Sequence, residues 1–168
     1  CFGGRIKNIT DIENRLRLGV DKITLNKSLY KDPDFVKNAI KEFGSQCIVA
    51  SIDYIGNGKS AVLYDVNSRD VSNINLFDFC LTVEDMGVGE ILLNSVERDG
   101  MKNGFDIDQI DRISKNVSIP VIACGGCGTW EHFSEVFAKT DADAVPAANI
   151  FQHVAQSTYL AKKFLYDK

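Results

Sequence analysis

The chain lacks an excess of positive charge, a long apolar run and a visible signal peptide. Its 19 lysines and arginines are outnumbered by 23 aspartates and glutamates, which gives a formal net charge of -4. No basic patch predicts nucleic-acid binding, and no apolar run approaches the roughly 20 residues of a membrane span. Hydrophobic residues make up 45% of the chain and charged residues 25%. We therefore expect a globular enzyme of the cytoplasm, with no nucleic-acid or membrane partner.

Cysteine is scarce and odd in number, which predicts reduced thiols in a reducing compartment. The five cysteines are Cys1, Cys47, Cys80, Cys124 and Cys127. Cys124 and Cys127, with His132 five residues further on, have the spacing of a metal or redox site. A structural zinc needs four ligands, and no second pair accompanies this one, so we predict incidental thiols without metal or cofactor. His132 and His153 are expected to be packing or surface residues.

The chain does contain an internal repeat at an offset of 122 residues. Gly3, Gly4, Asp21 and Ile23 recur as Gly125, Gly126, Asp143 and Val145. Each copy has the pattern of a strand, a paired-glycine turn, an amphipathic helix and a second strand opened by aspartate. Paired glycines after a strand let the backbone approach a ligand with its N–H groups outward, which suits phosphate. One pair alone would indicate a tight turn, but two in register favour two phosphate loops.

The repeat also predicts the fold. Twice 122 is 244 residues, close to the about 250 of a barrel with eight strand–helix units. The 168 residues present would then be strands three to eight, with Cys1 inside the third strand. Since low-complexity segments and linkers are absent, we expect one α/β domain over 1–168. It would be an incomplete (βα)8 TIM barrel without its first two strand–helix units.

Near-continuous apolar runs predict buried parallel strands, with helices between them. The strands are expected at 22–26, 47–54, 90–95, 120–124 and 143–147. The helices are expected at 34–43, 75–86, 108–116, 129–139 and 157–165, after an earlier helix opened by a capping box of Thr10 and Glu13. Asn57 and Gly58 predict a small hairpin between residues 56 and 66. Pro146 is unusual inside a strand.

Two carboxylates are expected where barrel strands end, at the C-terminal rim that carries the chemistry of such folds. Asp53 follows an apolar run and is a candidate general acid or base, although a solvated loop residue would look the same. Asp99 precedes Gly100, which fits either a functional carboxylate or a plain type I turn. Both candidates gain weight because the two glycine loops are predicted at the same rim.

Three segments carry a resemblance to a known family. They are the run GEILLNSVERDG from Gly89 to Gly100, the run VASID that ends at Asp53, and the GGCG turn at Gly125 followed by Glu131-His132-Phe133. Together they resemble the cyclase subunit of imidazole glycerol phosphate synthase over essentially the whole chain. The Glu-His-Phe segment distinguishes it from the sister isomerase of histidine biosynthesis, which shares the barrel and both phosphate loops.

The resemblance implies a ribulose-phosphate-binding barrel and a lyase reaction. In it, ammonia and a bis-phosphorylated ribulosyl-formimino substrate give imidazole glycerol phosphate and aminoimidazole carboxamide ribotide. Asp53 resembles one catalytic carboxylate, and the repeat puts its twin about 70 residues before Cys1. The implied phosphate- and substrate-binding residues are Gly3, Gly4, Asn26, Asn94, Asp99, Gly100, Gly125, Gly126, Ala148 and Asn149.

The resemblance also implies a glutaminase subunit, docked on the opposite face of the barrel, that supplies ammonia through the interior. Asp21, Lys22 and Glu90 match positions at this docking face and at its charged gate, although charges at strand entrances are often only solvated. Two departures concern the first phosphate loop. Arg5 stands where the family has a third glycine, and Lys27 replaces a small residue. The positive charge of either residue would strengthen anion binding. For Arg5 the alternative is that its side chain obstructs the loop.

Two other hypotheses remain open from the sequence. Asn94, where the cyclase usually has threonine, and Asn149-Ile150-Phe151 resemble a paralogue found with bacterial surface-polysaccharide genes, which would supply ammonia for sugar amidination. The other hypothesis is a non-catalytic barrel that docks and activates a glutaminase. The 168 residues alone are expected to be inactive, with activity belonging to a longer parent chain.

Overall fold

The computed structural model describes residues 1–152 and 158–167. Its parallel strands pair side by side in chain order. They are β1 (Phe2–Gly3), β2 (Ile23–Leu25), β3 (Ile48–Ile55), β6 (Glu90–Ser95) and β7 (Val121–Cys124). The helices between and after them are α1 (Ile9–Arg17), α2 (Ser28–Lys31), α3 (Pro33–Phe43), α4 (Leu76–Asp85), α5 (Ile107–Ser114), α6 (Trp130–Lys139) and α7 (Thr158–Tyr166). Short 3-10 turns are η1 (Ser45–Cys47), η2 (Gly58–Ser60) and η3 (Asn149–Gln152).

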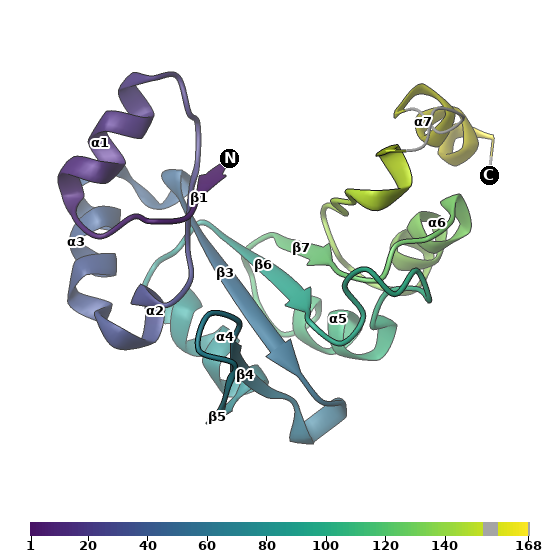
Figure 1. Ribbon diagram of the computed structural model, residues 1–168, viewed down its shortest axis with the longest axis horizontal. Coiled ribbons are helices and arrows are strands. Elements are labelled where there is room, and N and C mark those ends of the chain that lie inside the picture. The colour runs from purple at the N-terminus through teal and green to yellow at the C-terminus, as the bar shows by residue number, and fades with distance from the viewer. Residues whose placement is uncertain (153–157, 168) are drawn as a thin grey trace.

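The helices lie along the outer side of a curved sheet, as Figure 1 shows. Successive strand residues point to opposite faces, and in β6 they alternate strictly between half-buried and buried. The buried set, which includes Ile91 and Leu93, belongs to a core shared with Ile12 of α1, Val36 of α3 and Val83 of α4. The other set faces the inner side and remains half-buried. The outer face therefore stabilises the fold, and the inner face is left for the site.

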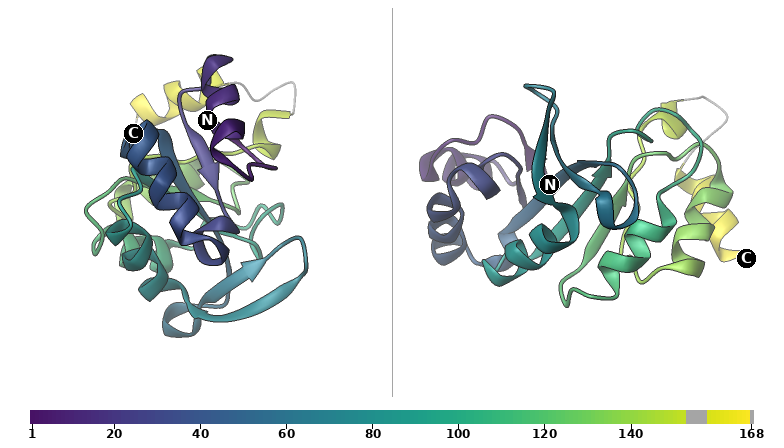
Figure 2. Two further views of the ribbon diagram at one scale, coloured as in Figure 1. Left: turned by 90° about the vertical axis from the view of Figure 1, so that its left-hand side faces the viewer. Right: turned by 90° about the horizontal axis from the view of Figure 1, so that it is seen from below.

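An antiparallel hairpin extends the sheet beyond the end of β3. It consists of β4 (Val62–Asp65), which pairs with Tyr54 and Ile55 of β3, and β5 (Asp70–Asn75). Figure 2 shows its turn projecting from the body of the molecule. A hairpin was expected here, but between residues 56 and 66. It is larger because Asn57 and Gly58 belong to the connection into η2, and the turn falls at 66–69 instead.

The expected helices are present, and three of them, α1, α3 and α4, begin at a side-chain cap. Asp32 accepts a hydrogen bond from the N–H of Phe35, and Asn75 accepts from those of Phe77 and Asp78. The predicted capping box at Thr10 is wrong. Asn8 caps α1 by accepting from the N–H of Asp11 at 2.9 Å, so Thr10 lies inside the helix.

The last expected strand, 143–147, is only partly formed. Ala144 makes an isolated parallel bridge with Ile122, and the N–H of Val121 donates to the Asp143 carboxylate. Pro146 has no N–H for a ladder, which accounts for the lack of a longer strand. Within residues 1–152 and 158–167 no pairing joins this segment to β1, so the described sheet is open. The same residues contain no helix long and apolar enough to cross a bilayer.

Candidate functional site

Asp53 lies between two asparagine side chains at the C-terminal rim of the sheet. Its Oδ2 accepts a hydrogen bond from Nδ2 of Asn26 at 2.9 Å, and its Oδ1 accepts one from Nδ2 of Asn94 at 2.7 Å. Amide N–H groups can donate to a carboxylate but leave its charge intact. The arrangement therefore fixes the carboxylate in one orientation with both oxygens engaged.

Strand register brings these three residues together. Asp53 in β3 pairs directly with Asn94 in β6, which pairs with Cys124 in β7. Asn26 follows β2, whose Leu25 is in register with Ala50. In parallel strands, side chains in register point to the same face, so Asp53, Asn94 and Cys124 form one row across the inner face. Oδ1 of Asn94 is buried and accepts no hydrogen bond from the described residues.

The first paired-glycine loop follows β1, beside β2. A Cβ on Gly3 would lie 2.0 Å from Oγ1 of Thr24, so a side chain there would force Thr24 to shift. Gly4 has φ +91° and Arg5 has φ +57°, a left-handed conformation that is uncommon for a residue with a side chain. Both residues are exposed, and the Arg5 N–H donates to no other group among the described residues. The loop thus offers an exposed donor.

The second paired-glycine loop follows β7 and lines a cavity of about 210 Å³. A Cβ on Gly125 would lie 2.6 Å from the Ser95 carbonyl oxygen, and one on Gly126 would lie 2.1 Å from that of Gly104. The N–H of Gly104 in turn donates to the Gly126 carbonyl at 2.9 Å. The loop is therefore locked against the segment after β6. The residues lining the cavity are Asp99, Gly100, Cys124, Gly125, Gly126, Cys127, Pro146, Ala147 and Ala148.

The structure gathers most of the expected second-site residues around this cavity. Asp99, Gly100, Gly125, Gly126 and Ala148 all line it, while Asn94 lies next to it in the Asp53 row. Asn149 opens η3, and its side chain, like the whole of His153, lies outside the described part of the structure.

The two cysteines of the cavity are held as thiols. Burial raises the pKa of Cys127 to about 11. Burial is also the main cause of a raised pKa at Cys124, with the charges of Asp99 and Asp53 adding to it. A thiol in this state is a poor nucleophile and a poor metal ligand. No group of three or more histidine, cysteine or acidic side chains in the described ranges could hold a metal ion.

His132 has a role that the sequence did not reveal. Its Nδ1 accepts a hydrogen bond from the N–H of Gly128 at 3.0 Å, which ties the start of α6 to the second loop. The only hint in the sequence is the four-residue spacing.

The proposed gate residues divide into a contacting pair and an exposed neighbour. Lys22, before β2, forms an ion pair with Glu90 at the start of β6, at the end of the strands opposite to Asp53. Glu90 keeps 18% of its side chain exposed and Lys22 keeps 38%. Asp21 is exposed and makes no side-chain contact with the described residues. The inner face thus has a charged pair at one end and the Asp53 row at the other.

Comparison with known proteins identifies the family. The family model described as "Histidine biosynthesis protein" matches residues 1–157. The chain belongs to the histidine biosynthesis protein family. A relative from Vibrio vulnificus with the provisional name imidazole glycerol phosphate synthase subunit hisF2 is 46% identical over 96% of this chain. Imidazole glycerol phosphate synthase subunit HisF from Clostridium botulinum is 41% identical over 99% of it in strain Okra and 42% over 97% in strain Kyoto.

The chain is shorter than these relatives from the histidine biosynthesis family. It spans 61% of the Vibrio protein and 66% and 65% of the two Clostridium proteins. It therefore covers less than two thirds of the length of each. The family match supports the barrel architecture, and the described residues form a mixed α/β structure whose sheet is open.

Proposed function

We propose that the chain provides the cyclase site of an imidazole glycerol phosphate synthase. The observation that carries the proposal is the position of Asp53, which two amides hold at the rim between the two paired-glycine loops. A fixed carboxylate is suited to proton transfer, and a loop on either side suits a substrate with a phosphate at each end. The names of the relatives support the same activity.

In this proposal the substrate is the bis-phosphorylated ribulosyl-formimino compound, and ammonia is the second reactant. Gly3 and Gly4 bind one phosphate, and the second-loop residues bind the other. Asn26 and Asn94 act on Asp53 instead of on phosphate, because their amide groups already donate to its carboxylate. Asp99 would repel a phosphate, so it suits a hydroxyl or amine of the substrate in the 210 Å³ cavity.

Ammonia is proposed to come from a glutaminase subunit at the strand entrances, where the Lys22–Glu90 pair lies. Asp21 is exposed on this side and is available to a partner. The internal repeat and the open sheet support two further strand–helix units that complete the barrel and carry a second carboxylate. A cytoplasmic location stays a prediction. The surface-polysaccharide and docking-only alternatives are not favoured, because the relatives above carry the synthase name.

The test is turnover by the protein that carries this chain, supplied with ammonium salt and the bis-phosphorylated substrate. Formation of imidazole glycerol phosphate and aminoimidazole carboxamide ribotide, together with growth of a histidine auxotroph that expresses the protein, is the expected result. Failure of both assays by a folded protein would contradict the proposal.

A further inference from the structure

The two loop regions of the chain differ in charge although they repeat each other. The first corner is Gly4, Arg5, Asn26 and Lys27, and its equivalents at an offset of 122 form the second corner, Gly126, Cys127, Ala148 and Asn149. A thiol and an amide in the second corner thus correspond to two cations in the first. Because the two corners repeat each other, the second corner serves as a reference against which the charge of the first can be compared. The added charge is a property of the first corner alone.

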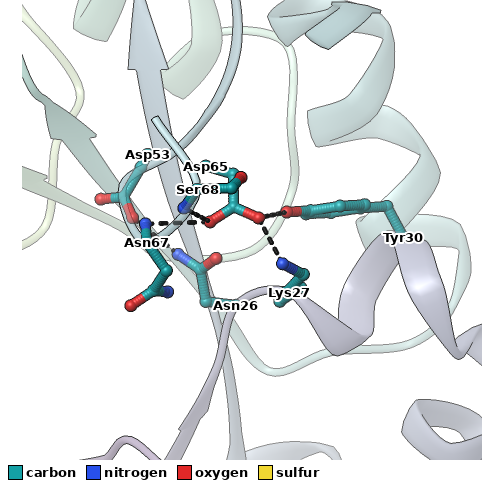
Figure 3. Close-up of polar contacts among 7 residues, drawn as sticks. All are labelled: Asn26, Lys27, Tyr30, Asp53, Asp65, Asn67 and Ser68. Atoms are coloured by element: carbon teal, nitrogen blue, oxygen red, sulfur yellow. Dashed lines mark hydrogen bonds and ion pairs between the residues drawn. The ribbon is translucent and has the colours of Figure 1, made fainter. Parts of the chain in front are cut away.

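Lys27 does not point freely into solvent. Its Nζ lies 2.5 Å from Oδ2 of Asp65, which comes from the end of β4 in the projecting hairpin. Figure 3 shows the two side chains meeting, with Tyr30 at the same oxygen of the carboxylate and Asn67 and Ser68 at the other. The hydrogen bond between them raises the pKa of Lys27 and lowers the pKa of Asp65. The ion pair therefore ties the hairpin to the first corner.

Asp65 does not depend on Lys27 for its hydrogen bonds. Its Oδ1 accepts from the N–H groups of Asn67 at 3.0 Å and Ser68 at 3.3 Å, and its Oδ2 also accepts from the Tyr30 hydroxyl at 3.4 Å. Lys27 has 49% of its side chain exposed. The ion pair contributes little to stability because Lys27 is exposed. Asp65 keeps only 13% of its side chain exposed, but its three other donors stay with the carboxylate when Lys27 leaves.

A cavity of about 370 Å³ lies between α2 and the hairpin, bordered by Lys27, Tyr30 and Asp65. Tyr30 also borders a small cavity of about 10 Å³ that reaches Asp53 and Asn26. The hairpin contact and the candidate catalytic carboxylate are thus separated by one side chain, and Lys27 directly follows the residue that holds Asp53. A change of partner at Lys27 takes place next to the reaction site.

We propose that Lys27 is the specificity-determining residue of the first corner and exchanges Asp65 for a ligand phosphate. A phosphate monoester carries nearly two negative charges and accepts charge-assisted hydrogen bonds, so it competes well with the single charge of the Asp65 carboxylate. Arg5 lies on the same corner and its side chain forms no hydrogen bond or ion pair with the described residues. Once Lys27 binds phosphate, the hairpin loses its ion pair to the corner and loosens. This inference rests on the proposed function, since it assumes that phosphate binds at the paired-glycine loops.

The test is a titration of the intact protein with inorganic phosphate, followed by the backbone amide signals of Gly4 and Gly126 in nitrogen-15 NMR. Asp65→Asn frees Lys27, so phosphate should bind about two- to fivefold more tightly at Gly4 and unchanged at Gly126. Lys27→Met should weaken binding at Gly4 alone. In the wild-type protein, saturating phosphate should speed hydrogen exchange of hairpin amides 62–75, a readout that needs no variant.

Exchanging the charges of residues 27 and 65 distinguishes the effect of the ion pair on the hairpin from the effect of Lys27 on anion binding. Lys27→Asp combined with Asp65→Lys should keep the hairpin protected but weaken phosphate binding at Gly4. Lys115→Met, which removes a comparable exposed pair with Asp111, should change neither quantity. Unchanged affinity at Gly4 in Asp65→Asn, or hairpin exchange that phosphate does not alter, overturns the role of Lys27. A response at Gly126 alone also overturns that role only, whereas no response at either glycine contradicts the proposed function as well.

Discussion

At the scale of single residues, the site is defined by how Asp53 is held. A bare carboxylate on a strand end would rotate and exchange its partners with water, whereas each Asp53 oxygen here accepts from a different asparagine. Asn26 and Asn94 come from neighbouring elements on either side of β3, so the orientation depends on the strand register. The asparagines thus position the candidate catalytic residue.

Arg5 is the residue with the most evident backbone strain in the first loop. Its φ of +57° is uncommon for a non-glycine residue, and the left-handed conformation costs about 1 kcal/mol or more. We predict that Arg5→Gly raises the free energy of unfolding by about 0.5–1 kcal/mol. The greater conformational entropy of glycine in the unfolded chain reduces this gain. Urea unfolding followed by circular dichroism measures it.

Two comparison variants show whether the gain comes from the backbone. Lys102 has φ +60° and is exposed, so Lys102→Gly should give a similar increase. Lys41 lies in α3, where Lys41→Gly should lower stability by up to about 1 kcal/mol. A decrease in stability with Arg5→Gly would mean that the arginine side chain makes contacts that outweigh the strain.

At the scale of elements, the two glycine loops share a positive φ at their second glycine but differ in their surroundings. Gly4 and Gly126 both have positive φ, yet nothing lies within 4 Å of a Cβ on Gly4, whereas a Cβ on Gly126 would lie 2.1 Å from the Gly104 carbonyl oxygen. Gly126 is therefore required by both close packing and backbone conformation, and Gly4 by backbone conformation alone.

We predict that Gly4→Ala lowers the free energy of unfolding by about 1–2 kcal/mol through strain. Gly126→Ala should lower it by at least about 2 kcal/mol more, because the loop must also move away from Gly104. Denaturant unfolding of both variants gives the comparison. Equal losses would show that the close approach at Gly126 relaxes without cost.

The hairpin should respond to acid through Asp65. Lys27 lowers the pKa of this carboxyl in the folded protein, so its contribution to hairpin stability is complete above the unfolded pKa of about 4. It is lost as the pH falls from there through the depressed folded pKa. We predict lower protection factors for amides 62–75 at pH 3 than at pH 6. Asp65→Asn serves as control and should remove this difference, and a wild-type hairpin insensitive to pH would contradict it.

Local patterns predicted the elements well, and long-range contacts account for most of what was missed. The helices expected at 34–43 and 75–86 and the strands around Asp53 and Asn94 follow from short motifs and apolar runs. Asn8 and Thr10 are both plausible caps by type, and only the backbone geometry distinguishes them. Lys27 and Asp65 lie 38 residues apart, so no local pattern could pair them.

At the scale of the whole molecule, the repeat predicted the parallel order of strands and the placement of both glycine loops on one rim. It could not predict how the copies differ, because the repeat is defined by what they share. The second copy ends in a single bridge at Ala144, while the first has a paired β2. The first corner carries added charge and a hairpin contact, and the second encloses a cavity.

The proposed ammonia gate and the proposed catalytic residue lie at opposite ends of the strands on the inner face. The Lys22–Glu90 pair lies where β2 and β6 begin, and Asp53 lies near the end of β3. In the proposed reaction, ammonia enters at the first end and reacts at the second. The proposed reaction depends most on Asp53.

The most direct measurement is ammonia-dependent turnover by Asp53→Asn in the protein that carries this chain, with the fold checked by circular dichroism. Asparagine keeps the size of the side chain but cannot transfer the proton, so the account predicts a loss of at least about 100-fold in kcat with the spectrum unchanged. Turnover at the wild-type rate in a folded variant would contradict the assignment of Asp53 and the cyclase site built around it.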